Sequence, residues 1–591
     1  MWDGITLVVS PLIALMKNQI DFLQTRGISA ARMDSSLTAE EARAANHELR
    51  SGKLKLLYVA PERFNNERFL EMIRRHNIAL FAIDEAHCIS EWGHNFRPDY
   101  LKLAETVKHL KAERVLALTA TATPSVVENI CARFGIPKQC AIVTGFYRPN
   151  LEIWTTPVPA PDRDRLLLDR LNSREPGATI VYVTLQKSAE RVASLLDNGG
   201  HPARAYHAGM ETDERTSVQE WWMSSDRNIV VATIAFGMGI DKANVRYVYH
   251  YNLPKSLESY SQEIGRAGRD GGPSIVDLFA CAEDVPVLEN FAYGDTPTPR
   301  ALGSLVEHIF AQSGEFDVSL YELSVRYDIR QLVLRTALAY IELLGFLKQR
   351  TPFYGSYKIK TLVSLSEIVG RFSGERAEFI RNMFSQAKEG RTWYTLDLAS
   401  AAEKMRQDRS RLVRAVEYLD QEGLVELQVA DVRQQYSIIR TPADVAELAS
   451  VLAKRFERRE QQEIGRVAQV LDLVLRDGCQ TNALVGYFGQ VREAPCNHCT
   501  WCRTHTAQQL PKLRPLAPLP ADLNVSGFTS MRNEYRDALG EPRQIARFLC
   551  GLTGPALTKH KLTRHSLFGV FEDRRFADVL GFAQKVFGDR G

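Results

Sequence analysis

Apolar and polar stretches alternate regularly through the first half of the chain. Short apolar runs occupy residues 5–9, 54–59, 79–83 and 115–118, and each is followed by polar or helical sequence. After residues 145–150 the pattern starts again, with runs at 179–183, 228–232, 247–251 and 274–280. Alternation of this kind predicts parallel sheets covered by helices. We therefore expect two α/β domains, with functional groups at the carboxyl ends of the strands and in the crevice between the domains.

The second half begins with a different pattern. Residues 301–362 have the order helix, short strand, helix, helix and hairpin, with 332–344 as the candidate recognition helix and 346–359 as the wing. A similar order follows at 376–389, 393–396, 397–404, 409–423 and 424–438, and Glu422-Gly423 ends its third helix. We expect two winged helices, which place a helix in a DNA groove or serve as protein-contact modules.

The pattern at the end of the chain predicts a linker followed by a helical region. Residues 511–520 are rich in proline, which is typical of a linker, and 542–586 has the pattern of an amphipathic helix. Its basic stretch comprises Lys559, His560, Lys561, Arg564 and His565. We interpret this stretch as a solvated helix face, with DNA contact as the alternative. The predicted domains are 1–146, 147–292, 300–445, 446–507, a linker at 508–524, and 525–591.

Composition narrows the class of protein. With 591 residues the chain is too long for one core and suggests roughly four domains. A hydrophobic content of 45%, a charged content of 25% and a net charge of +3 are typical of globular proteins and argue against a disordered chain. No apolar run approaches the roughly 18 residues of a membrane span, and no signal-peptide pattern opens the chain. We therefore expect a cytoplasmic protein without a membrane partner.

Two carboxylates close the third apolar run. Asp84 and Glu85 directly follow it, an arrangement with which nucleotide hydrolases hold Mg²⁺ and orient an attacking water. Such a site also needs a phosphate cradle, usually G-x-x-x-x-G-K-[ST], and residues 1–591 contain none. Gly52-Lys53 comes closest, but Leu54 follows it. Taken alone, the sequence D-E-A-H is more often a solvated turn.

Further candidate residues follow the other runs. Thr119 and Thr121 end the fourth run with hydroxyls able to sense a phosphate, and Gly239 belongs to a small-residue segment that permits close backbone approach. Arg266 and Arg269 lie three residues apart, on one face of a helical turn. Both can point across the crevice at a nucleotide held by the first domain, where arginine stabilises a transferring phosphoryl group.

Several segments together resemble RecQ-type DNA helicases of the second helicase superfamily. The aromatic-rich run at 85–100 is the most specific, and residues 9–16, 58–63, 206–209 and 262–271 also match that family's motifs. The resemblance implies an α/β fold with two RecA-like parallel-sheet domains, the first incomplete, followed by mostly α-helical winged-helix modules and a zinc-binding domain. It implies ATP and Mg²⁺ as cofactors and ATP-driven 3′–5′ unwinding of duplex or branched DNA in repair and recombination.

The resemblance also implies residue roles. Asp84 would coordinate Mg²⁺, Glu85 would activate water, and His87 would couple the nucleotide site to DNA. The nucleotide crevice would be lined by Thr119, Thr121, Gly239, Asp241, Gln262 and Arg266, with Arg269 as the arginine finger. Single-stranded DNA would contact Ser10, Trp92, His94, Phe96, Arg97 and His207, since rings stack on bases and guanidinium binds phosphate. Core packing is the alternative for Trp92 and Phe96. A single-strand binding protein is a candidate partner.

The chain departs from the family at its beginning. A complete RecQ helicase carries an adenine-reading glutamine motif and a phosphate loop, and this sequence has neither. We therefore hypothesise that Met1 is an internal methionine of a longer reading frame. A non-enzymatic, zinc-containing DNA-binding protein with an inactivated motor is the alternative. An RNA helicase is a third interpretation, which the RecQ-like loop and cysteines disfavour.

Four cysteines fall in one short window. Cys479, Cys496, Cys499 and Cys502 have the spacing C-x₁₆-C-x₂-C-x₂-C, and four thiolates suit a closed, tetrahedral, structural Zn²⁺ site. The spacing also matches the zinc site of the RecQ family. Free thiols are the alternative, and His498 and His505 could compete as ligands.

Overall fold

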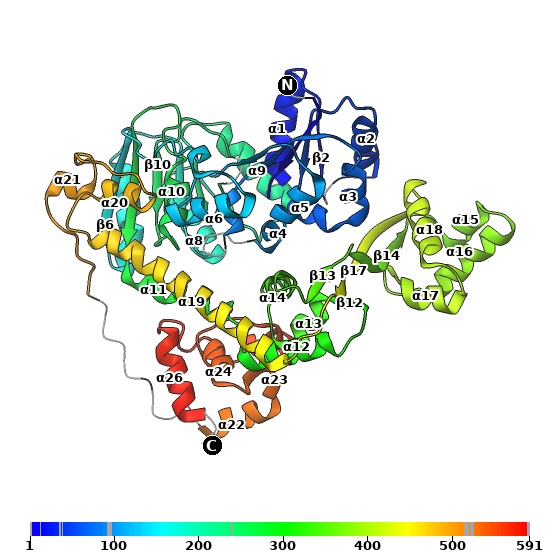
Figure 1. Ribbon diagram of the computed structural model, residues 1–591. Coiled ribbons are helices and arrows are strands. Elements are labelled where there is room, and N and C mark those ends of the chain that lie inside the picture. Colours follow the sequence, from blue (N-terminus) through cyan, green and yellow to red (C-terminus); the bar gives the residue numbers. More distant parts are fainter. Residues whose placement is uncertain are drawn as a thin grey trace. The chain divides into compact units, whose positions relative to one another are not determined.

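The computed structural model shows a chain built from two compact units (Figure 1). It describes residues 3–11, 13–34, 37, 39–90, 97–237, 240–512, 519 and 525–587. The first unit comprises Met1–Phe64, Phe69–Thr298 and Ala453–Gly591, and the second comprises Asn65–Arg68 and Pro299–Leu452. All candidate catalytic, nucleotide-binding and metal-binding residues belong to the first unit.

The first sheet has five parallel strands in the order β2-β3-β1-β4-β5. Their bounds are β1 Ile5–Val9, β2 Ala30–Met33, β3 Leu56–Val59, β4 Ile78–Ile83 and β5 Val115–Ala117. The helices that follow them include α1 Ile13–Thr25, α2 Ala39–Arg50, α5 Leu103–Leu110 and α6 Pro124–Phe134. Val9 of β1 pairs with Ile83 of β4, so the chain leaves these two strands side by side.

The second sheet has six parallel strands in the order β6-β11-β10-β7-β9-β8. Their bounds are β6 Leu151–Pro157, β7 Thr179–Tyr182, β8 Ala203–Tyr206, β9 Ile229–Ala232, β10 Tyr247–His250 and β11 Ser274–Ala280. The helices α7 Arg163–Asn172, α8 Gln186–Asn198, α9 Thr212–Met223, α10 Leu257–Ile264 and α11 Val285–Gly294 connect or follow these strands. The predicted pair of parallel α/β domains is thus confirmed.

The second unit holds one continuous antiparallel sheet in the order β12-β17-β14-β16-β15, with β13 also paired to β17. The strands are β12 Glu315–Ser319, β13 Leu347–Gln349, β14 Phe353–Thr361, β15 Lys388–Glu389, β16 Tyr394–Asp397 and β17 Val425–Ile438. The helices are α12 Pro299–Phe310, α13 Leu320–Tyr327, α14 Gln331–Leu343, α15 Leu365–Gly370, α16 Gly374–Gln386, α17 Leu398–Met405 and α18 Arg409–Gln421.

The prediction that each wing is a β-hairpin is wrong for both modules. Strands β13 and β14, expected to pair over 346–359, pair instead with β17. The segment 424–438 forms the single strand β17, whose amino-terminal part pairs with β14 and whose carboxyl-terminal part pairs with β12 and β13. One strand therefore completes both modules. The candidate recognition helix α14 buries eight of its side chains between Val333 and Ile341 and exposes Gln331, Leu332 and Arg335, so its contact with DNA stays a prediction.

The carboxyl-terminal region is a cluster of short helices. It contains α22 Val525–Glu534, α23 Arg536–Leu539, α24 Pro542–Leu549, α25 Pro555–Lys559 and α26 Phe576–Phe587. The single amphipathic helix predicted over 542–586 is wrong, because the left-handed Gly551 (φ 73°) and then Pro555 interrupt it. Within the basic stretch, Lys559 Nζ and His560 Nε2 lie 3.2 and 2.8 Å from Asp537 Oδ2.

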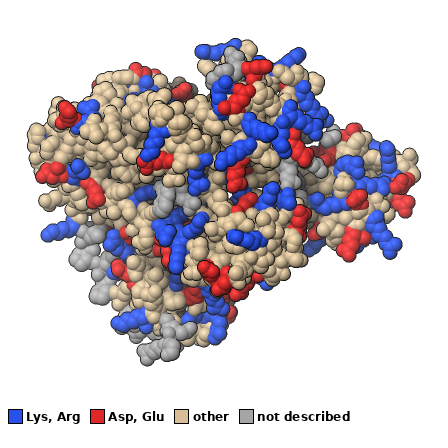
Figure 2. Space-filling model, in the orientation of Figure 1, with Lys and Arg blue, Asp and Glu red and all other residues tan. Residues whose placement is uncertain are grey.

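Charge is mixed over the visible face of the molecule, where Lys and Arg alternate with Asp and Glu (Figure 2). A nucleic-acid footprint therefore has to be argued from particular residues rather than from net charge. Within the described residues, no helix combines the length and the hydropathy required to cross a bilayer.

Candidate functional site

The first group of site residues surrounds Asp84, at the carboxyl end of β4. Its backbone N–H donates to Val9 O (2.8 Å), which continues the ladder with β1. Ser10 Oγ donates to Asp84 Oδ2 (3.1 Å), and the Glu85 N–H donates to Asp84 Oδ1 (2.9 Å). Tyr100 completes the arrangement by donating its hydroxyl to Asp84 O (2.9 Å). Ser10 and the Glu85 N–H thus orient the carboxylate, while Val9 and Tyr100 hold the backbone of Asp84.

The electrostatics around Asp84 favour a cation. Burial, and then the neighbouring Glu85 carboxylate, raise the pKa of Asp84 above its usual range, although the hydrogen bonds from Ser10 and the Glu85 N–H oppose this rise. A divalent cation would offset the repulsion between the two carboxylates. Carboxylate and hydroxyl oxygens are also the donors that Mg²⁺ prefers, so Asp84, Glu85 and Ser10 fit such an ion.

Glu85 and His87 connect this group to the end of β5. Glu85 has a left-handed backbone (φ 49°), which is uncommon for a residue other than glycine. His87 Nδ1 lies 3.3 Å from Glu85 Oε2 and 2.9 Å from Thr119 Oγ1. Burial would lower the pKa of His87, but its contacts with Cys88 and Glu85 outweigh this effect and raise the pKa to about 9. A buried, protonated imidazole therefore joins Glu85 to the threonine segment.

The second group comes from the turn after α10. Arg266 Nη1 donates to Gly237 O, and a Cβ on Gly237 would meet Arg266 Nη2 at 2.5 Å, so only glycine lets the guanidinium lie there. Arg269 Nη1 donates to Asp241 Oδ1 (2.9 Å) and to Ile240 O (3.3 Å). Arg269, the predicted arginine finger, is thus ion-paired with Asp241, which was also predicted to line the crevice.

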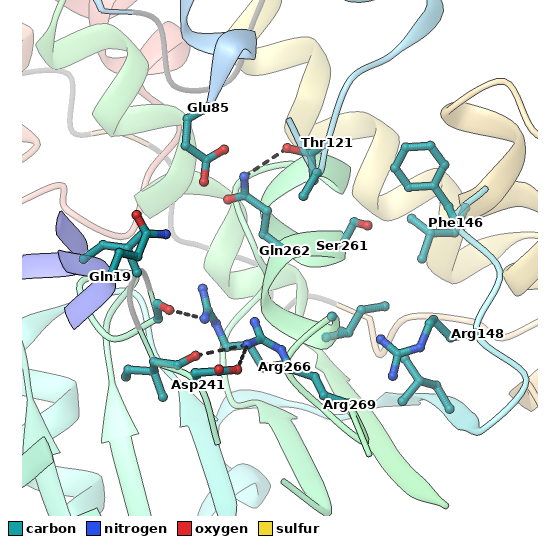
Figure 3. A pocket seen from close by; sticks show the side chains of 18 of the residues that line it. Gln19, Glu85, Thr121, Phe146, Arg148, Asp241, Ser261, Gln262, Arg266 and Arg269 are labelled. Carbon is teal, nitrogen blue, oxygen red and sulfur yellow. Dashed lines mark hydrogen bonds and ion pairs between the residues drawn. The ribbon is translucent and has the colours of Figure 1, made fainter. Parts of the chain in front are cut away.

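Glu85 from the first group and Asp241, Arg266 and Arg269 from the second line one cavity of about 880 Å³, whereas Asp84, His87 and Thr119 are not among the residues that line it (Figure 3). Gln262 Nε2 donates to Thr121 Oγ1 (2.9 Å) and so links the second sheet's arginine segment to the first sheet. The predicted residues that line the cavity are Glu85, Thr121, Asp241, Gln262, Arg266 and Arg269. Within the described residues, the buried Arg266 Nε lacks a hydrogen-bond partner, whereas Glu85 Oε2 is ion-paired with His87. The cavity therefore brings a carboxylate and arginine side chains together around one space.

Other residues of the cavity carried no signal in the sequence. Gln19, Phe146, Arg148 and Ser261 line it. Arg148 Nη2 donates to Ala267 O (3.1 Å) and to Gly268 O (2.7 Å), and burial together with the nearby Arg269 lowers the pKa of Arg148. Thr481, Leu484 and Val485, from the cysteine-containing segment, complete one wall. Only the tertiary fold brings these residues to the site.

The four cysteines form a compact cluster. Their Sγ atoms all lie within 4.8 Å of one another. Backbone N–H groups of Asn482 and Cys496 donate to Cys479 Sγ, and that of Cys499 donates to Cys496 Sγ, as befits thiolate ligands. The hydrogen bond with Cys496 lowers the pKa of the Cys499 thiol below its usual range. His498, an alternative ligand, instead has Nε2 3.1 Å from the Tyr147 hydroxyl.

The residues expected to contact DNA are only partly described. Trp92, His94, Phe96 and the crevice residue Gly239 lie outside the described residues. Arg97 Nη1 donates to Pro11 O (3.3 Å). Two others are buried: Ser10, at 1% exposure, gives its hydroxyl to Asp84, and His207, at 5%, has Nε2 3.2 Å from Glu190 Oε1. The Ser10 side chain is thus directed to Asp84, and its contact with single-stranded DNA stays a prediction.

Three family descriptions match the chain. Residues 2–130 match the DEAD/DEAH box helicase family, 162–271 match the helicase conserved C-terminal domain, and 430–503 match the RecQ zinc-binding family. The chain is 41% identical to the ATP-dependent DNA helicase RecQ of Haemophilus influenzae over 316 residues, which are 53% of this chain and 50% of that protein. The Bacillus subtilis RecQ is also 41% identical, over 49% of this chain and 48% of its own length. The chain belongs to the RecQ family of helicases.

This RecQ chain also aligns more widely with a plant relative. ATP-dependent DNA helicase Q-like 5 of Arabidopsis thaliana is 30% identical over 98% of the chain and 64% of its own length. Of the two bacterial RecQ proteins, by comparison, the chain spans about half the length. All four clustered cysteines fall within the RecQ zinc-binding match, and four convergent thiols fit tetrahedral Zn²⁺. The cluster is the zinc site of this RecQ chain.

Proposed function

We propose that this RecQ-family chain is an ATP-dependent DNA helicase that moves 3′ to 5′ and unwinds duplex or branched DNA. It would act in repair and recombination, in the cytoplasm and in association with the nucleoid. The observation that carries this proposal is the cavity lined by Glu85, which follows a strand of the first sheet, and by Arg266 and Arg269, which follow α10 of the second. That arrangement suits a nucleotide whose binding brings the two sheets together and whose hydrolysis releases them.

Each residue group has a role in the proposal. Asp84, held by Ser10, would bind Mg²⁺, and Glu85 would orient and deprotonate the attacking water. Arg266 would stabilise negative charge on the phosphoryl group, and Arg269 would join it after releasing Asp241. His87 and Thr119 would transmit the state of this site toward the DNA-binding segment that includes Arg97. Single-stranded DNA is the expected partner, with a single-strand binding protein as a candidate.

Strand separation on tailed duplexes tests the proposal. With ATP and Mg²⁺, the chain should displace the short strand of a DNA duplex that carries a 3′ single-stranded tail. A duplex with a 5′ tail and an RNA duplex with a 3′ tail should remain paired. Displacement only from the 5′ tail would contradict the direction, and displacement of RNA alone would favour an RNA helicase.

A second candidate function is DNA binding by a zinc-containing protein with an inactive motor. It is motivated by the sequence of residues 1–591, in which no G-x-x-x-x-G-K-[ST] motif occurs. This protein would bind single-stranded DNA with unchanged affinity in the presence and absence of ATP, and it would displace no strand from any of the tailed duplexes.

A further inference from the structure

The zinc segment is built into the edge of the second sheet. Cys499 forms a parallel bridge with Ile153 of β6, and Thr500 Oγ1 accepts the Thr155 N–H (2.7 Å). Gln480 Nε2 donates to Thr155 Oγ1 (2.7 Å). Cys496, Cys499 and Cys502 belong to the same hydrophobic cluster as the sheet's own core. The cysteine ligands of zinc and the strands of the second sheet therefore share one hydrophobic core.

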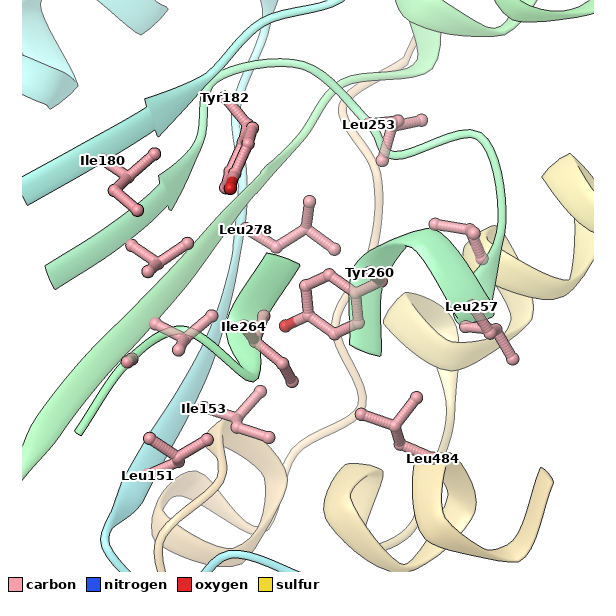
Figure 4. Packing of buried hydrophobic residues seen from close by; sticks show 14 of the residues in the cluster. Leu151, Ile153, Ile180, Tyr182, Leu253, Leu257, Tyr260, Ile264, Leu278 and Leu484 are labelled. Atoms are coloured by element: carbon pink, nitrogen blue, oxygen red, sulfur yellow. The ribbon is translucent and has the colours of Figure 1, made fainter. Parts of the chain in front are cut away.

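The same segment holds α10, the helix that leads to the arginines. Tyr487, at the end of α20 Gln480–Tyr487, donates its hydroxyl to Glu258 Oε1 (2.8 Å). Glu258 is only 4% exposed, and Arg466 of α19 Val445–Leu475 approaches the same oxygen at 3.9 Å. Figure 4 shows Leu484 of α20 in the cluster that contains Leu257, Tyr260 and Ile264 of α10. A hydrogen bond and apolar packing thus connect the zinc segment to α10.

A third connection reaches the junction between the two sheets. Gln490 Oε1 accepts the N–H groups of Phe146 (2.6 Å) and Tyr147 (3.0 Å). Phe146 also stacks on Phe488, with ring centroids 4.4 Å apart. Phe146 lines the cavity, as do Thr481, Leu484 and Val485 of the zinc segment. The segment therefore contacts the junction, the arginine helix and the cavity wall at once.

We infer that the zinc segment positions the nucleotide cavity through Tyr487 and Gln490, so that zinc binding and nucleotide binding are thermodynamically coupled. The nucleotide half of this inference rests on the proposed function. If the zinc-bound segment fixes α10 and the junction in the arrangement that a nucleotide needs, zinc raises nucleotide affinity. By linkage, the nucleotide raises zinc affinity by the same factor. Tyr487 and Gln490 are positioning residues, since they act through α10 and Phe146.

A purely structural zinc site predicts something different. It would stabilise the segment whether or not a nucleotide is present, and the Tyr487 hydroxyl would contribute only its own hydrogen bond. Coupling instead requires that Tyr487→Phe, which keeps the ring and all four cysteines, weakens the effect of one ligand on the other. Tyr321→Phe is the matched control, because Tyr321 is 67% exposed and lies in the second unit.

The test measures zinc affinity by competition with a chromophoric chelator, with and without Mg²⁺-ADP. For the wild-type chain and Tyr321→Phe, Mg²⁺-ADP should raise zinc affinity by about fivefold or more. For Tyr487→Phe the factor should fall toward one, while one zinc per chain is retained. The inference is overturned if wild type binds Mg²⁺-ADP without any change in zinc affinity, or if Tyr487→Phe keeps the wild-type factor.

Hydrogen exchange separates this inference from the proposed function. In zinc-loaded Tyr487→Phe without nucleotide, amides of Leu257–Ile264 should exchange several-fold faster than in wild type, and Tyr321→Phe should leave them unchanged. Failure of wild type to bind Mg²⁺-ADP overturns the proposed function and the coupling that rests on it. Unchanged exchange in α10 overturns the positioning role itself, even when nucleotide binds.

Discussion

The chemistry of the site depends on a few side chains with unusual surroundings. Glu85 has a left-handed backbone, lines the cavity, and is ion-paired through Oε2 with the buried His87. Backbone strain of this kind costs on the order of 1–3 kcal/mol and persists where surrounding structure enforces it. Here the enforcing contacts are those that hold Asp84 and His87 on either side. Strained backbone of this kind clusters at active sites, and Glu85 lies at the cavity wall.

Removing the imidazole of His87 should change how the free energy of unfolding depends on pH. Because the pKa of His87 is raised to about 9 in the folded state, its stabilising contribution is complete below about 6.5 and is lost as pH rises through about 9. His87→Gln should therefore lower the free energy of unfolding most at low pH, by at most about 3 kcal/mol. Urea unfolding at several pH values checks this, with the exposed His109→Gln as control. A difference that grows with pH would contradict it.

Gly237→Ala should impair activity more than stability. The added Cβ would meet the Arg266 guanidinium, whose far end can move away, so folding survives while the arginine leaves its place in the cavity. We expect the DNA-stimulated rate of ATP hydrolysis to fall by roughly ten- to a hundredfold, because small misplacements of catalytic groups are costly. Gly303→Ala, where a Cβ meets nothing within 4 Å, is the control. Equal rates in the two variants would argue against a role for Arg266.

At the scale of elements, zinc should stabilise more than its own loop. Cys499 is both a zinc ligand and the bridge partner of Ile153 in β6. Cys499→Ser should lose zinc and unfold the segment around 479–502, since a structural zinc contributes folding energy directly. Zinc content and limited proteolysis check this, with the exposed Cys140→Ser as control. Zinc loss with unchanged protease resistance and helical signal would contradict the prediction.

Local pattern revealed most strands of the two parallel sheets but missed β2, β6 and β8, which all lie at sheet edges. The runs that form β7, β9, β10 and β11 are apolar and were predictable, whereas β2 and β8 are four-residue strands, each with an arginine. The missing hairpins have a different cause. Nothing local to β17 shows that one strand pairs with β12, β13 and β14, because pairing between distant segments is set by the packed sheet.

At the scale of the whole molecule, the sequence indicated which residues meet but not all that surrounds them. Glu85, Gln262 and Arg266 were predictable because motifs at strand ends converge where parallel sheets face a common crevice. The zinc segment's place in the cavity wall was not, because Thr481 and Leu484 carry no motif and reach the site only through packing on the second sheet. The RecQ chain therefore contains a candidate nucleotide site that is completed by its metal-binding segment.

The most direct test of this account is single-strand-stimulated ATP hydrolysis by the chain and by Glu85→Gln, measured side by side. If the cavity is a nucleotide site controlled by DNA, single-stranded DNA should stimulate hydrolysis by the wild-type chain. Glu85→Gln should lose at least about a hundredfold of that rate, the size expected for a general base, while still binding DNA. Equal, near-background rates for both proteins would contradict the account and favour a DNA-binding protein with an inactive motor.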